Sequence, residues 1–251
     1  MNTKEHILSV ENLDVNIGSR AILHNISFAV SPGEIVGIIG PNGCGKTTLL
    51  NAVSGFTEIG TGTVSFAGND IMELLPYQRA NLGISRGFQH AGIFREMTVE
   101  ENLMLTIEVS EKLPWWWSLV GDRRQHVQKL IDAVLADVDL GAHKKSLAGL
   151  LSGGQLRLLE LAKLRLAKGK LLLIDEPTAG VAPALKNKLA EIITKLVKDH
   201  GHTAIIVEHD IKFLFDLATR IIVLVDGEKY LEGTPGEVRA DERLKKVYFG
   251  E

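Results

Sequence analysis

A short glycine-rich segment near the start of the chain has the spacing of a phosphate-binding loop. Residues 40–47 are Gly-Pro-Asn-Gly-Cys-Gly-Lys-Thr and fit the pattern G-x-x-x-x-G-K-[ST]. In such a loop the backbone N–H groups point toward a phosphate, the lysine reaches the β- and γ-phosphates, and the threonine hydroxyl binds Mg²⁺. We therefore expect a nucleoside triphosphate and Mg²⁺ here, and the loop alone leaves kinases, GTPases and ATPases open.

Two adjacent carboxylates narrow this choice. Asp175 and Glu176 directly follow the apolar run 171–174. A buried sheet delivers side chains to its carboxyl edge, so Asp175 is placed to hold Mg²⁺ through water and Glu176 to orient or deprotonate an attacking water. Paired acids at a strand end can also form a solvated turn, but a phosphate loop in the same chain favours a catalytic role.

The spacing of apolar residues predicts the elements that must position these groups. Residues 35–39, 171–174, 204–207 and 221–225 are short, nearly all apolar runs, as expected for strands that helices cover on both faces. Helical stretches adjoin the first three, which indicates parallel strands with helical crossovers. Residues 226–227, Asp-Gly, predict a turn that returns the chain after the last run.

The remaining segments predict two further parts. Residues 8–15, 22–30 and 63–67 are expected to be strands of a small antiparallel layer. Beyond about residue 90 the pattern becomes helical. One helix face is predicted to carry Val127, Leu130, Ile131, Val134 and Leu135.

A third motif lies between the phosphate loop and the paired acids. Residues 151–155 are Leu-Ser-Gly-Gly-Gln, followed by a predicted helix to about residue 167. Ser152 offers a hydroxyl, and the amides of Gly153 and Gly154 are free to meet an anion at a helix N-terminus. A plain N-cap serine would explain Ser152 but not the whole string. The string resembles the signature of ABC-type ATPases.

The resemblance covers nearly the whole chain and implies a fold, a site and partners. The implied fold is α/β, a P-loop NTPase (RecA-like) core with a mostly parallel sheet, an N-terminal antiparallel β subdomain and an inserted helical subdomain at about residues 90–165, all within one domain of residues 1–251. Gln89 matches the family's glutamine beside Mg²⁺ and the attacking water, in a loop that touches the membrane subunit, and His209 matches the histidine that contacts the γ-phosphate. In the family two such chains enclose two ATP molecules head to tail.

The expected site residues fall into three groups by role. The catalytic group is Glu176, His209 and Gln89, and the metal group is Thr47, Gln89 and Asp175. The nucleotide-binding group is Gly40, Pro41, Asn42, Gly43, Cys44, Gly45, Lys46, Thr47, Thr48, Ser152, Gly153, Gly154 and Gln155.

Two positions depart from the family pattern. Ile17 stands where an aromatic residue usually stacks on adenine, and Ala182 where Asp or Asn usually helps to link the two sites of a dimer. Ala182 would be easier to understand in an unequal pair of subunits. His200 and His202 have near-ligand spacing, but we expect a solvated loop there because no Cys or carboxylate set accompanies them.

Composition excludes several classes of protein. The 28 Lys and Arg against 31 Asp and Glu give a net charge of −3, so no basic surplus indicates nucleic acid. The single cysteine, Cys44, cannot form an intrachain disulfide, which fits a reducing compartment. The first residues are too charged for a signal peptide, and the apolar runs are too short for a membrane helix. The resemblance to ABC-type ATPases implies a peripheral protein on the cytoplasmic face of the inner membrane.

The resemblance favours the ATPase subunit of a transporter, with separate permease subunits, a second ATPase chain and, for an importer, a substrate-binding protein as partners. Residues 87–103, 178–181 and 247–251 look most like ATPases of branched-chain amino-acid and amide importers. Lipid and lipopolysaccharide exporters share much of this pattern and remain an alternative, as do ABC ATPases outside transport and a non-hydrolysing regulator.

Two local features carry their own expectations. Cys44 lies within the phosphate loop, where amides and Lys46 should favour the thiolate, the alternative being an inert side chain turned into the core. Residues 115–117 are three consecutive tryptophans. They are expected either to cover the helical subdomain or to form a docking surface for a partner or lipid.

Overall fold

The chain is built on a six-stranded sheet whose central strands are buried along their full length. A computed structural model describes residues 6–87, 92–111, 121–167 and 169–244. The strand order is β10-β9-β3-β8-β7-β6, parallel except for β10 at one edge. The strands are β3 (Ile35–Ile39), β6 (Ile84–Gly87), β7 (Leu171–Asp175), β8 (Thr203–Val207), β9 (Arg220–Val225) and β10 (Glu228–Gly233).

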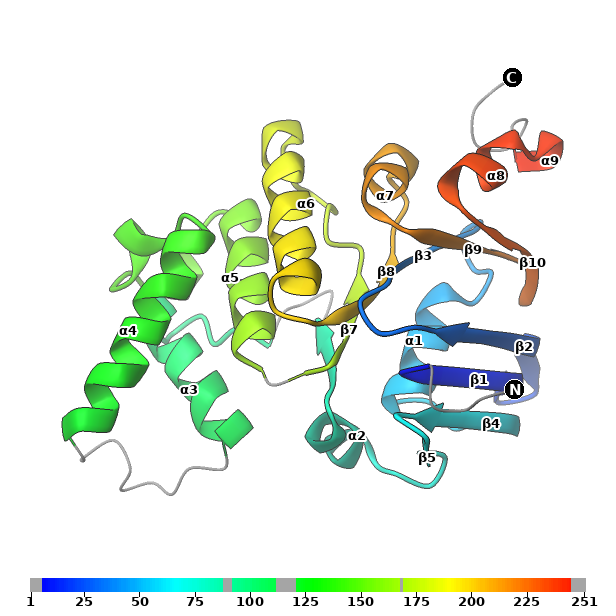
Figure 1. Cartoon of the computed structure of the whole chain (residues 1–251), viewed down its shortest axis with the longest axis horizontal. Coiled ribbons are helices and arrows are strands. Elements are labelled where there is room, and N and C mark those ends of the chain that lie inside the picture. The colour runs from blue at the N-terminus through cyan, green and yellow to red at the C-terminus, as the bar shows by residue number, and fades with distance from the viewer. Residues whose placement is uncertain (1–5, 88–91, 112–120, 168, 245–251) are drawn as a thin grey trace.

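Alternate residues of these strands enter two different cores, because successive side chains of a strand point to opposite faces. On one face Ile35, Leu172 and Ile206 pack with the helices α5 (Gly153–Leu166), α6 (Pro183–Lys198) and α7 (Ile211–Leu217). On the other face Val36 and Ile38 pack against α1 (Lys46–Ser54) and the antiparallel sheet. Figure 1 shows the sheet between these two layers.

The second sheet has the order β2-β1-β4-β5 and is antiparallel throughout. Its strands are β1 (Leu8–Ile17), β2 (Arg20–Val30), β4 (Thr61–Phe66) and β5 (Asn69–Asp70). The His24 N–H donates to Gly227 O at 2.8 Å, which ties β2 to the β9–β10 turn. The antiparallel layer thus lies against the end of the sheet from which the phosphate loop emerges.

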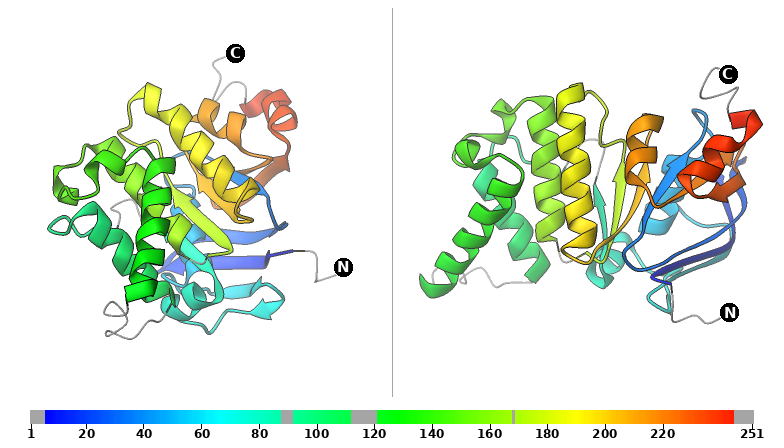
Figure 2. Two further views of the ribbon diagram at one scale, coloured as in Figure 1. Left: turned by 60° about the vertical axis from the view of Figure 1, so that its left-hand side comes forward. Right: turned by 45° about the horizontal axis from the view of Figure 1, so that its top comes forward.

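The remaining helices cover the ends of the molecule. Helices α3 (Val99–Glu111) and α4 (Gly121–Asp137) lie together beyond α5, at the left of Figure 1 and in both views of Figure 2. Two 3₁₀ turns, η2 (Gly141–His143) and η3 (Ala148–Leu150), lead back to α5, while α2 (Pro76–Leu82) precedes β6. Helices α8 (Pro235–Ala240) and α9 (Glu242–Leu244) follow β10.

The expected α/β architecture, with a mostly parallel sheet and an antiparallel layer, is confirmed. The Asp226-Gly227 turn is also as expected, since both residues have positive φ (47° and 81°) and join antiparallel strands. The predicted apolar face of α4 is buried at four of its five positions, Val127, Ile131, Val134 and Leu135. Leu130, at the edge of this face, is 38% exposed.

A buried arginine fixes the C-terminal end of the helix that follows the phosphate loop. Arg79 on α2 is 3% exposed. It donates to Ala52 O at 2.7 Å, Val53 O at 3.0 Å, Leu74 O at 2.9 Å and Met72 O at 3.0 Å. The carbonyls of a last helical turn have no partner within the helix, so the guanidinium supplies donors that the backbone cannot.

Replacing Arg79 by Met should lower the free energy of unfolding by roughly 2–4 kcal/mol, since buried carbonyls lose their charged donor. Urea denaturation followed by circular dichroism measures the loss. Arg20→Met, at an exposed arginine of β2, is the matched control and should stay within about 0.5 kcal/mol of wild type. An Arg79→Met chain with an unchanged midpoint would show that these carbonyls do not need the guanidinium.

Candidate nucleotide-binding and hydrolysis site

The site lies at the edge where the carboxyl ends of β3, β8 and β7 meet. Because these strands are parallel neighbours, the residues that follow each of them emerge side by side. The phosphate loop follows β3, Glu208 and His209 follow β8, and Glu176 follows Asp175 at the end of β7. Segments that are more than a hundred residues apart in sequence are therefore assembled at one edge.

The phosphate loop has the backbone that its glycines permit. Gly45 has φ 102° and is the N-cap of α1, with no side-chain cap on that helix. A Cβ on Gly45 would lie 2.4 Å from Leu23 Cδ2, so packing as well as the dihedral angle requires glycine. Because Gly45 has no side chain to cap α1, this helix N-terminus is open to an anion at the positive end of the helix dipole.

Lys46 is buried, at 6% exposure, and its ammonium group lies inside the loop. The Nζ atom donates to Gly40 O at 2.7 Å and to Pro41 O at 2.9 Å. Backbone carbonyls thus hold the cation where the loop closes on itself. A phosphate entering the loop offers this ammonium a charged acceptor in place of two neutral ones, which makes a stronger hydrogen bond.

The expectation that the loop favours a Cys44 thiolate was wrong. Cys44 is 4% exposed and packs in the core between the two sheets. Burial raises the pKa of its thiol, and the nearby Lys46 charge offsets only part of this effect. The inert alternative describes the residue better, because a side chain turned into an apolar core is not solvated as a thiolate.

Asp175 is a buried carboxyl, and one of its oxygens has no hydrogen-bond partner in the described part of the chain. It is 4% exposed, and burial raises its pKa, although the charge of Arg86 acts in the opposite direction. Arg86 Nη2 lies 3.5 Å from Asp175 Oδ2, while Asp175 Oδ1 has no hydrogen-bond partner among the described residues. Thr47, the first residue after Lys46, hydrogen-bonds to this carboxyl.

Glu176 and His209 form a direct pair across the edge. Glu176 Oε1 and His209 Nε2 are 3.0 Å apart, with side chains that are 22% and 46% exposed. Glu176 has φ 50°, the left-handed region that a residue with a Cβ rarely adopts, and its N–H donates to Val207 O at 2.9 Å. Such an unusual backbone at a polar surface position is typical of functional sites.

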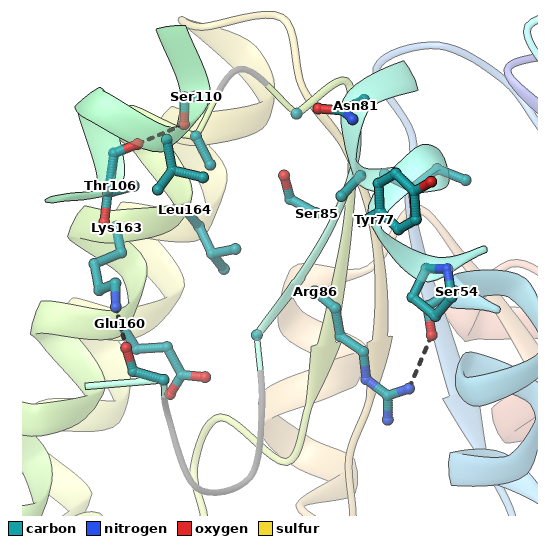
Figure 3. Close-up of a pocket in the computed structure, with 18 of the residues that line it drawn as sticks. Ser54, Tyr77, Asn81, Ser85, Arg86, Thr106, Ser110, Glu160, Lys163 and Leu164 are labelled. Atoms are coloured by element: carbon teal, nitrogen blue, oxygen red, sulfur yellow. Dashed lines mark hydrogen bonds between the residues drawn. The ribbon is translucent and has the colours of Figure 1, made fainter. Parts of the chain in front are cut away.

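Two polar residues of this site were missed by the sequence reasoning. Arg86, on β6, donates to Ser54 Oγ at 3.0 Å in addition to its contact with Asp175 (Figure 3). Glu208 is 3% exposed and stands at the end of β8. The signal for Glu208 was present, because it follows an apolar strand just as Glu176 does, whereas nothing local indicated the partners of Arg86.

The signature segment, residues 151–155, forms the N-terminus of α5. Ser152 is the N-cap of α5 and is exposed; its Oγ accepts from the Gln155 N–H at 3.3 Å, and Gln155 Oε1 accepts from the Ser152 N–H at 2.9 Å. A Cβ on Gly154 would lie 2.4 Å from Leu185 Cδ2, so glycine lets α5 and α6 approach. Within the described ranges no hydrogen bond or ion pair joins residues 152–155 to Lys46, Asp175 or His209.

The remaining positions that the sequence singled out can now be placed in the structure. His202 was expected in a solvated loop but is 8% exposed, and its Nδ1 pairs with Gly169 O, because it enters the buried start of β8; His200 is exposed as expected. Ile17 is 54% exposed at the end of β1, and Ala182 is an N-cap with no side-chain bond. Gln89, the tryptophans at 115–117 and residues 247–251 lie outside the described residues.

A cavity of about 710 Å³ opens next to the site. One wall comes from α2 and β6 and the other from α3 and α5 (Figure 3). Its apolar lining includes Tyr77, Phe94 and Val109, which are 62%, 50% and 70% exposed. Arg86 also lines this cavity, so one side chain contacts both the cavity and Asp175.

Among the helices of the described residues, none has the length and hydropathy of a membrane-spanning segment.

This fold and this edge together define a P-loop nucleotide hydrolase. The family "ABC transporter" matches residues 23–179, and the chain belongs to that family and is an ATPase. It is 36% identical over 245 residues to the lipopolysaccharide export system ATP-binding protein LptB of Haemophilus influenzae, covering 98% of both chains. It is 34% identical over 250 residues to the high-affinity branched-chain amino acid transport ATP-binding protein LivG of Escherichia coli K12, again covering 98% of both.

A solved structure shows the same fold. The crystal structure of the ADP conformation of MJ1267, an ATP-binding cassette of an ABC transporter, matches with a TM-score of 0.84 and 32% identity. The match covers 98% of this chain and 99% of that one. The family resemblance and the expected P-loop NTPase fold are therefore confirmed, and the chain is a nucleotide-binding subunit of the ABC type.

Burial of Cys44 leads to a labelling prediction. In the folded chain Cys44 should react slowly with iodoacetamide at neutral pH, because a raised pKa leaves little thiolate. The rate should keep rising at pH values where an exposed thiol has levelled off. The control is the same chain unfolded in guanidinium chloride, in which the thiol is solvated. Equal rates in the folded and unfolded chains at neutral pH would contradict burial of the thiol.

Proposed function

We propose that this chain hydrolyses Mg·ATP to drive a membrane transporter, with Glu176 and His209 as its catalytic side chains. The observation that supports this role is their 3.0 Å pair at the edge that also carries the phosphate loop and the buried Asp175. Glu176 is placed to accept a proton from, or to orient, a water that attacks the terminal phosphate. His209 then contacts the γ-phosphate, and Gln89 has the role that the family resemblance gives it.

The loop residues bind the phosphates. Lys46 leaves its carbonyl acceptors for the β- and γ-phosphates, and the N–H groups of residues 42–48 surround them. The residues also fit Mg²⁺, because carboxylate and hydroxyl oxygens are the hard donors that this ion prefers. Asp175 Oδ1, which has no hydrogen-bond partner among the described residues, and the Thr47 hydroxyl are such donors. When bound, Mg²⁺ neutralises charge that develops on the phosphate oxygens.

A second ATPase chain completes the site. Residues 152–154 present a hydroxyl and a helix N-terminus at the surface, and no described contact joins them to the phosphate loop of the same chain. In a head-to-tail pair each signature meets the other chain's nucleotide, as the family resemblance implies. The partner is either a second copy or a different ATPase, and Ala182 in place of the usual Asp or Asn favours an unequal pair.

The cavity between α2 and α3 is the place for the permease. It is open and apolar, and its lining includes Gly87 and Gly92. In sequence these two residues flank the segment with Gln89, which the resemblance assigns to the contact with the membrane subunit. Arg86 lines this cavity and contacts Asp175, so a segment seated there acts on the hydrolytic edge through one side chain. The chain would then sit on the cytoplasmic face of the inner membrane, held there by its permease.

The transported solute is proposed to be a branched-chain amino acid or a related small polar solute, taken up with a substrate-binding protein. The likeness to LivG supports this choice, and the comparable likeness to LptB supports lipopolysaccharide or lipid export as the second candidate. Loss of labelled leucine uptake in a deletion strain, restored by the gene, tests the first. Normal uptake with a defect in the outer membrane would instead select export.

Replacing Glu176 by Gln should leave ATP binding intact and lower turnover on the order of 10²–10⁴-fold, because only the group that handles the attacking water changes. The same variant should form a dimer in Mg·ATP, which sizing chromatography detects. Glu228→Gln, at an exposed carboxylate of β10, is the matched control and should behave as wild type. Unchanged turnover in Glu176→Gln would remove Glu176 from its role.

A further inference from the structure

Glu208 is a buried carboxylate whose three hydrogen bonds all come from backbone N–H groups. Oε1 accepts from the Thr178 N–H at 2.7 Å. Oε2 accepts from the N–H groups of His209 at 2.8 Å and Asp210 at 3.1 Å. In the part of the chain that the structure describes, no cationic side chain pairs with it. The backbone donors alone therefore compensate a charge that is 3% exposed.

These three bonds join the two turns that carry the catalytic pair. Thr178 lies two residues after Glu176, in a turn closed by the Ala179 N–H donating to Glu176 O at 3.2 Å. His209 follows Glu208 directly. One oxygen therefore holds the turn after β7, and the other holds the turn after β8. The carboxylate thus bridges the two turns that carry Glu176 and His209, whose side chains are 3.0 Å apart.

A main-chain hydrogen bond also joins the ends of β7 and β8. The Glu176 N–H is fixed on Val207 O at 2.9 Å, one residue before Glu208, so the two strand ends are joined by main chain as well as by the carboxylate. Glu176 holds its left-handed φ of 50° only while its surroundings enforce it. The Glu208 carboxylate is the side chain that anchors the segment immediately after that strained residue.

We propose that Glu208 is a positioning residue for ATP hydrolysis, whose carboxylate holds the turns after β7 and β8 so that Glu176 and His209 face the same phosphate. This inference rests on the proposed roles of Glu176 and His209. A carboxylate is needed because both of its oxygens accept. An amide in the same place turns its NH₂ toward one of the backbone N–H groups, whichever way it is oriented.

The test measures kcat and KM for ATP, nucleotide binding and the thermal midpoint in the full chain. Glu208→Gln should lower kcat by about 10-fold to 100-fold, since misplacement of catalytic groups by about 1 Å has effects of this size. KM and nucleotide binding should change less than about threefold, because the phosphate loop is untouched. Glu208→Asp keeps two accepting oxygens on a shorter side chain and should recover part of the lost kcat.

Glu100→Gln is the matched control for burial. Glu100 is 8% exposed and pairs with Lys144 and Lys145 on the far side of α5, away from the hydrolytic edge. It should lower the thermal midpoint without a selective loss of kcat. If Glu208→Gln loses kcat only in proportion to its thermal midpoint, as this control does, or keeps kcat at the wild-type level, the proposal is overturned.

Two further outcomes are decisive. Should Glu208→Gln fail to fold, Glu208→Met decides, because its side chain has no accepting oxygen and a folded Met variant with wild-type kcat means that the bridge is not required. Glu176→Gln is measured in parallel. Full turnover in Glu176→Gln contradicts the proposed function itself, whereas loss of turnover there with wild-type kcat in Glu208→Gln contradicts only the positioning role.

Discussion

The parallel pairing of β8 between β3 and β7 is the constraint on which the rest of the site depends. Parallel neighbours end at the same edge, so the phosphate loop, the Glu208–His209 segment and the Asp175–Glu176 segment have no other place to emerge. The two cores, one on each face of this sheet, fix the strands in that order. A shift in register would move the carboxylates away from the loop, because successive side chains point to opposite faces.

Three ionisable side chains are buried at this edge, Lys46, Asp175 and Glu208. Lys46 is buried against two neutral carbonyls, and Glu208 accepts from backbone N–H groups. Among the residues that the structure describes, one Asp175 oxygen has no partner. Each arrangement costs folding free energy compared with an apolar side chain of similar size. Arg79, away from the site, shows the contrasting case of a buried cation that supports a helix end. The buried polar groups of the site therefore lower the stability of the fold, and the packing of the two cores compensates for this loss.

Arg86 connects the cavity to the edge of the sheet that carries Asp175. Its guanidinium contacts Asp175 on one side and lines the cavity between α2 and α3 on the other. A partner that changes the cavity changes the surroundings of this one side chain, and with it the electrostatic environment of a buried carboxyl. Ser152 at the start of α5 is exposed, and within the described ranges no hydrogen bond or ion pair joins it to Lys46 or Asp175.

The sequence by itself determined the phosphate loop, the central strands, the antiparallel layer and the family, because each depends on local spacing or on the period of apolar residues. The roles of Glu176, His209 and Gln89 stay predictions that carry the proposed function. Only the tertiary structure decided that Cys44 and His202 are buried, that Leu130 is not, and that Arg86 and Glu208 belong to the site. Arg86 meets Asp175, and Glu208 meets Thr178, across 89 and 30 residues of chain. Such contacts arise from strand order, and no short pattern of residues records which strands become neighbours.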